Sequence, residues 1–131
     1  MTRPKKLNRD ALTVDLPDRI SADWLRGLGA CSEAVAIFRK RWPKGAPVKP
    51  ETVIRAVNLG LDMNWLALRI LTDITFRQYR EAEKPALRAY YDAMFTATAF
   101  SSWKAYREAK APASKAYREA TVKALANILW K

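Results

Sequence analysis

Residues 79–93 read YREAEKPALRAYYDA, and residues 106–120 read YREAKAPASKAYREA. The YREA motif begins at Tyr79, Tyr106 and Tyr117, and a degenerate copy, YYDA, begins at Tyr90, so both pairs of tyrosines are eleven residues apart. Eleven residues make almost three helical turns, so residues spaced 3-4-4 stay on one face and favour a slight right-handed supercoil. The predicted face consists of Tyr79, Ala82, Ala86, Tyr90, Ala93, Ala97, Tyr106, Ala109, Ala113, Tyr117, Ala120, Ala124 and Ile128.

The repeat changes register once. The interval from Tyr90 to Tyr106 is sixteen residues rather than eleven, which indicates a turn near residues 100–103, FSSW. Such a turn predicts a helical hairpin in which alanines let two arms approach closely, and a continuous kinked rod is the alternative. Pro85 and Pro112 occupy equivalent places in their repeats. Because proline lacks a backbone donor and disfavours helix in the preceding residue, we expect kinks or helix starts at both positions.

Before the repeats, start and stop signals predict four short helices. Ser21 and Ser32 can cap the first two, Pro50 favours the start of the third, and Asp62 can cap the fourth. Glycine at position 29 suits the left-handed turn after a helix end, and position 60 offers the same signal. The residues expected to face the core are Trp24, Leu25, Leu28, Val35, Ile37, Phe38, Val53, Ile54, Val57, Trp65, Leu66, Ile70 and Leu71.

The remaining N-terminal residues differ from both helical parts. Arg3, Lys5, Lys6 and Arg9 form a basic arm, and residues 12–17, LTVDLP, have no helical periodicity. They predict an extended stretch or a short strand. The fold class is therefore all-α. It comprises the arm and extended segment at 1–20, a small helical domain at 21–74, and repeat helices at 75–131.

Composition narrows the chemistry. The 131 residues include 24 Lys and Arg against 13 Asp and Glu, a formal charge of +11, with no histidine and one cysteine. This composition leaves no disulfide framework, Cys/His zinc site or imidazole base, so we predict neither an enzyme nor a cofactor or metal site. The N-terminus lacks an apolar core like that of a signal peptide, and no apolar run is long enough to span a bilayer, so we expect a cytoplasmic protein.

The excess charge calls for an anionic partner. Nucleic acid, a nucleoprotein complex with an acidic surface, or an acidic protein face would fit, whereas the alanine and tyrosine face is too weakly apolar for membrane adsorption. Residues 1–75 hold 13 basic and 8 acidic residues and residues 76–131 hold 11 and 5, so a general basic surface is favoured over one pocket. The candidate contact residues are Arg39, Lys40, Arg41, Trp42, Lys44, Arg80, Lys104, Arg107, Lys110, Lys115 and Arg118.

Several of these features have a purely structural explanation. The cluster at 39–44 would also suit a solvated helix end with Trp42 in the core. Residues 52–71 fit a helix-turn-helix in which only Asn64 could read a base, but a structural helical hairpin is the favoured explanation. Most aromatic residues should be packing elements, with Trp103, Tyr106 and Tyr117 kept as partner contacts to test. Cys31 is expected to be buried.

The chain also resembles a group of small phage and prophage proteins over about residues 24–130. The resemblance is carried by LGACSEAV at 28–35, WPKG at 42–45, GLDMNWLA at 60–67 and the tandem YREAxxPAxxA units. That group is mostly of unassigned function, so the resemblance implies phage origin, with the host cytosol as the site of action. Small phage proteins that bind without catalysing often act as inhibitors of host defence, including anti-CRISPR proteins, which is an analogy.

Two functions therefore stay open at the level of sequence. The first is a non-catalytic, phage-type binder of a nucleic acid or nucleoprotein complex that inhibits a host defence system. The second is a structural or assembly protein, a homo-oligomer that associates through its alanine-rich repeat helices.

Overall fold

The computed structural model describes residues 6–97 and 102–130 and confirms the all-α class. The described residues contain six α-helices, one short 3-10 turn and one two-stranded sheet, so β-structure is minor. The helices are α1 Ala22–Gly27, α2 Ser32–Arg41, α3 Pro50–Asn58, α4 Met63–Ile70, α5 Asp73–Ala97 and α6 Trp103–Leu129. The other elements are the 3-10 turn Arg9–Ala11, β1 Arg19–Ile20 and β2 Ala46–Pro47.

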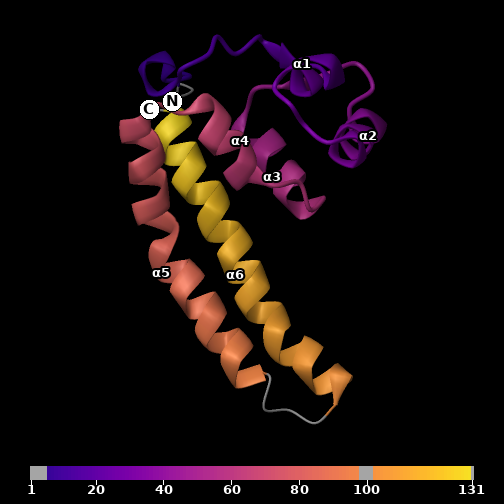
Figure 1. Cartoon of the computed structure of the whole chain (residues 1–131), viewed down its shortest axis with the longest axis vertical. Helices are drawn as coiled ribbons and strands as arrows, with labels where there is room; N and C mark the ends of the chain where they lie inside the picture. The colour runs from indigo at the N-terminus through magenta and orange to yellow at the C-terminus, as the bar shows by residue number, and fades with distance from the viewer. Residues whose placement is uncertain (1–5, 98–101, 131) are drawn as a thin grey trace, which may run out of the picture.

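The molecule has a head and a long helical hairpin (Figure 1). Helices α1 to α4 form the head. Helix α5 leads away from the head and α6 returns to it, so the two lie side by side and antiparallel. The hairpin predicted from the repeats is therefore present, and the kinked rod is not. The predicted turn at 100–103 lies partly outside the described residues, which resume with Ser102 as the cap of α6.

Side-chain caps mark the starts of two of the four short helices. The Ser21 side chain accepts a hydrogen bond from Trp24 N at 3.0 Å, and Asp62 accepts one from Trp65 N at 3.1 Å, as the sequence predicts. Gly29 has φ +98° directly after α1, where side chains with a Cβ are disfavoured. The prediction for Ser32 is wrong, because Cys31 occupies the cap position of α2 and Ser32 already lies in the first turn.

The core extends beyond the head into the end of the hairpin. The last turns of α6 supply Leu125, Ile128 and Leu129, which pack with residues of α3, α4 and the N-terminal segment. Trp130 then pairs with Leu7 in an isolated antiparallel bridge, which brings the two ends of the described chain together. Ile54 was predicted to face the core but is exposed, because α3 turns Val53, Ala56 and Val57 inward instead.

The extended N-terminal stretch contacts the head through single backbone bridges and not through a continuous strand. Leu12 has β-region dihedrals and forms a bridge with Leu71, and Thr13 N donates to the Ile70 carbonyl at 2.7 Å. The strand itself, β1, begins later than predicted and pairs antiparallel with β2, with Ile20 opposite Ala46. Arg3 and Lys5 of the basic arm lie outside the described residues.

The inner face of α5 departs from the eleven-residue pattern. Ala82 is exposed, and Glu83, one residue further along, is fully buried. The buried and half-buried positions Tyr79, Glu83, Ala86, Tyr90, Ala93 and Ala97 alternate steps of four and three, which is a seven-residue rhythm. The predicted 3-4-4 spacing is therefore wrong for α5 at Ala82. The inward positions of this helix repeat every seven residues, or two turns, instead of every eleven residues, or three turns.

The two prolines lie within continuous helices, so neither marks a helix start. Pro85 and Pro112 are both exposed. Since they lie on the solvent side of α5 and α6, water can bind the carbonyl groups that lose their helical partners.

Candidate nucleic-acid interface

The net positive charge of the hairpin comes from one of its two helices. Within its bounds α6 contains six basic and two acidic residues, whereas α5 contains four of each. Both long helices carry polar outer faces, but only α6 has a net charge, of +4. The sequence predicts a general basic surface, and within the hairpin that surface is on α6. An extended anionic partner would therefore be attracted to α6 rather than to α5.

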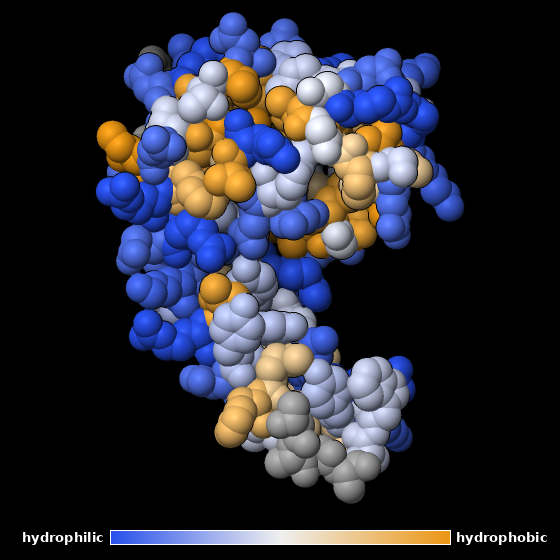
Figure 2. Space-filling model, in the orientation of Figure 1, coloured by the Kyte–Doolittle hydropathy of each residue, from blue (hydrophilic) through white to orange (hydrophobic). Residues whose placement is uncertain are grey.

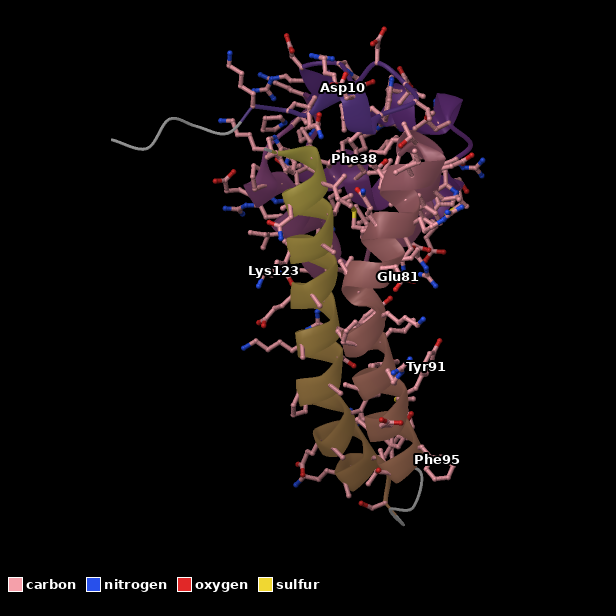
Figure 3. The ribbon with its side chains drawn as sticks, turned by 90° about the vertical axis from the view of Figure 1, so that its left-hand side faces the viewer. Asp10, Phe38, Glu81, Tyr91, Phe95 and Lys123 are labelled. Carbon is pink, nitrogen blue, oxygen red and sulfur yellow. The ribbon has the colours of Figure 1, made fainter. Side chains whose placement is uncertain are left out.

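The exposed cations of α6 form two pairs on its outer side. Lys104 and Arg107 make the first pair, and Lys115 and Arg118 repeat it eleven residues later. At 1.5 Å per residue the pairs are about 16 Å apart along the helix and lie on nearly the same face. Lys123, near the head, also points away from α5 (Figure 3). Glu108 and Glu119 flank this stripe and reduce its field only in part.

Three predicted contact residues of the hairpin have partners within the protein. One of them is Arg107, whose guanidinium lies 5.9 Å from the centre of the Trp103 ring. Arg80 Nη1 lies 2.5 Å from Oε1 of the buried Glu83, so its charge is compensated. Lys110 is half-buried, with its Nζ 5.9 Å from the centre of the Tyr106 ring. Arg80 is therefore the weakest member of the predicted set.

The cluster at the end of α2 is split between surface and core. Arg39, Lys40, Arg41 and Lys44 are exposed. Trp42 is half-buried against the core, and its ring lies 5.0 Å from that of Phe38. The indole therefore serves as a packing element. This cluster lies in the head, whereas α6 begins at the far end of the hairpin, so the structure does not unite the predicted residues in one site (Figure 1).

The far end of the hairpin exposes aromatic rings. Trp103 is 68% exposed and stacks on Tyr106, with 5.3 Å between ring centroids and an interplanar angle of 17°. Tyr91 and Phe95 of α5 are also exposed and point away from α6 (Figure 3). Figure 2 shows the same change, because the blue edge along α5 gives way to less polar surface at this end.

The contacts of α4 argue against the helix-turn-helix hypothesis. Asn64 Nδ2 donates to the Tyr117 hydroxyl at 3.2 Å, and Asn64 Oδ1 accepts from the Tyr79 hydroxyl. Met63 and Ala67 are buried in the core, and Asp62 caps α4. Because the one side chain suited to read a base is bound within the protein, the contacts favour a structural helix over a recognition helix for α4.

A buried polar network joins the hairpin to the head, and the sequence analysis did not predict it. Glu83 has no exposed surface, and its Oε2 accepts from the Tyr117 hydroxyl at 3.4 Å. Burial raises the pKa of Tyr79, and the nearby Glu83 charge raises it further. Burial also raises the pKa of Tyr117, partly offset by its hydrogen bond with Asn64. Tyr117 is thus half-buried, and its hydroxyl is bound within the protein.

One signal in the repeats could have revealed this network. The fourth residue after each tyrosine is Glu83, Met94, Lys110 or Thr121, whereas the third is alanine in every copy. The structure turns all four of these variable positions at least partly inward.

The head also contains an apolar cleft of about 310 Å³. Its walls come from the segments around α1 and α2 on one side and from α3, α4 and the end of α6 on the other. Figure 2 shows apolar surface in this part of the head, below α2. Cys31 lines the cleft and is exposed, so the prediction that it is buried is wrong. It lies at the start of α2, at the edge of the core.

The described residues show neither a cluster of metal ligands nor a helix suited to span a membrane. No three Cys, Asp or Glu side chains within 6–97 and 102–130 gather as a metal site requires. None of the described helices combines the length and apolar character needed to cross a bilayer. Comparison with known proteins found no matching family model, no matching curated protein and no matching solved structure.

Proposed function

We propose that the protein is a non-catalytic binder of a nucleic acid or nucleoprotein complex and that α6 is its main contact surface. The observation that carries the proposal is a stripe of four exposed cations on one side of α6, the helix that holds the net charge of the hairpin. Lys104, Arg107, Lys115 and Arg118 recur there at a spacing of eleven residues. Since phosphate contacts dominate nucleic-acid affinity, four exposed cations in register are a suitable electrostatic surface.

The biological role proposed with this binding is inhibition of a host defence system. It rests on the resemblance to small phage proteins, so nucleoprotein effectors of such systems are the first complexes to assay. The elongated shape supports the choice, because the hairpin extends its charged helix well beyond the head (Figure 1). A pulldown from host lysate, with and without nuclease, separates nucleic-acid partners from protein partners.

Salt titration with matched variants tests the binding proposal. Four phosphate contacts on a single strand give a slope of about −2.8 in a plot of log affinity against log salt, or about fifty-fold weaker binding between 50 and 200 mM salt. The double variant Lys115→Gln/Arg118→Gln should reduce that slope by about 1.4. Lys40→Gln/Lys44→Gln in the head changes the formal charge equally and should have the smaller effect. Absence of any complex at low salt would refute the proposal.

The alternative of self-assembly through the alanine-rich face finds no support in the packing. That face is used inside the hairpin, where the Tyr90 and Tyr117 rings lie 5.6 Å apart and the Tyr106 hydroxyl donates to Met94 Sδ at 3.5 Å. Light scattering over a range of protein concentrations tests this alternative independently.

A further inference from the structure

The far end of α6 combines an aromatic surface with cations in one turn. Trp103 is the first residue of α6 and lies largely in solvent, and its inner face stacks on Tyr106. The Tyr106 hydroxyl in turn contacts Met94 of α5. The indole therefore stacks on a ring that contacts both helices, and Trp103 still exposes 68% of its surface.

Basic residues lie on the same turns of α6 as this pair of rings. The Arg107 guanidinium lies 5.9 Å from the centre of the Trp103 ring, and Lys110 Nζ lies at the same distance from Tyr106. Lys104 is exposed beside them. Between residues 102 and 111 the chain has three basic residues and one acidic residue, Glu108.

From this geometry we infer that Trp103 stacks an unpaired base, while Lys104 and Arg107 bind the phosphates beside it. The inference rests on the proposed function and narrows its ligand to single-stranded nucleic acid. Aromatic rings next to cations are the usual means of holding single strands, because every base has a π-face and every nucleotide carries a phosphate. Duplex bases are already stacked on one another, so a duplex would meet only the cations.

The experiment compares three oligonucleotides of equal length by fluorescence anisotropy with the full chain. They are a single-stranded oligothymidylate, its abasic counterpart with the same phosphates, and a duplex. The wild-type protein should bind the oligothymidylate about tenfold more tightly than the abasic strand, since stacking on one aromatic ring contributes about that factor or more.

Variants of the ring then assign the preference to Trp103. Trp103→Ala should abolish the difference between base-containing and abasic strands, and Trp103→Phe should keep most of it. Because the side chain is 68% exposed, both variants should fold normally, which circular dichroism checks.

The failure of this inference differs from the failure of the proposed function. If Trp103→Ala binds all three ligands as the wild type does while Lys115→Gln/Arg118→Gln weakens them all, base stacking is refuted and charge-based binding stands. If wild type binds none of them at low salt, both proposals fail. If Trp103→Ala loses only a defined protein partner in nuclease-treated samples, the ring is a protein contact and the inference is overturned.

Discussion

The two ends of the α5–α6 hairpin use the same repeat in opposite ways. Next to the head, Tyr79 and Glu83 are fully buried and hydrogen-bonded into a network with Asn64. At the far end, Tyr106 begins the same YREA motif but supports the exposed Trp103. The motif therefore specifies a helix and a tyrosine anchor, and the residues around each copy decide whether that anchor stabilises the fold or presents a surface.

The largest effect should follow from removing the buried carboxylate. Glu83→Ala deletes the partner of the Tyr117 hydroxyl and leaves a cavity between the helices, so we expect about 2–3 kcal/mol of lost unfolding free energy. The exposed neighbour gives a matched control, because Glu81→Ala makes the same change of charge and should cost less than about 0.5 kcal/mol. Urea denaturation measures both, and equal costs would show that the network does not stabilise the junction.

Asn64→Ala should destabilise the protein by about 2 kcal/mol, since it removes the acceptor of the Tyr79 hydroxyl and the donor to the Tyr117 hydroxyl, which keeps only Glu83. The same variant separates a structural α4 from a recognition helix. Its affinity for nucleic acid, measured on folded protein, should stay unchanged across different duplex sequences. A loss of sequence preference without a loss of stability would restore the helix-turn-helix hypothesis.

Alkaline pH should weaken the junction more than the far end. The folded-state pKa values of Tyr79 and Tyr117 are raised, so their contribution to stability is present below the unfolded value of about 10 and is lost as pH rises towards the folded values. Relative to its own stability at pH 9, Tyr79→Phe should lose about 1 kcal/mol less than wild type by pH 11. Urea denaturation at pH 9 and pH 11 measures the unfolding free energy of both proteins. An identical decrease for wild type and Tyr79→Phe would contradict the prediction.

The smallest effect on stability is expected at the far end. Trp103→Ala removes a ring that is mostly in solvent, so its unfolding free energy should change by less than about 0.5 kcal/mol. Thermal unfolding followed by circular dichroism measures the change. A cost similar to that of Glu83→Ala would show that the indole is part of the fold and not a surface for partners.

The sequence predicted where helices start and turn better than which of their residues point inward. Capping by Ser21 and Asp62 depends on neighbouring residues, and the hairpin follows from a local change of register, so both could be found without a structure. The choice between Ala82 and Glu83 as an inward position depends on what the opposite helix offers, here the hydroxyl of Tyr117. Likewise, the sequence alone allows Asn64 to read a base, because its hydrogen bonds with the hydroxyls of Tyr79 and Tyr117 depend on the tertiary fold.

The basic residues illustrate the same limit. Lysines and arginines could be counted along the chain, but their separation into a compensated Arg80, a cluster on α2 and a stripe on α6 depends on packing. Cys31 is predicted to be buried because the sequence offers it no base or second cysteine, whereas its place before α2 leaves it exposed at the edge of the apolar cleft.

The most direct test of the central claim is the affinity of the full chain for a single-stranded oligonucleotide as a function of salt, with the α6 pair and the head pair altered in turn. We expect binding at about 50 mM salt that weakens about fifty-fold by about 200 mM, with a shallower slope for Lys115→Gln/Arg118→Gln than for Lys40→Gln/Lys44→Gln. Equal slopes for the two variants, or no binding at low salt, would contradict the assignment of α6 as the nucleic-acid surface.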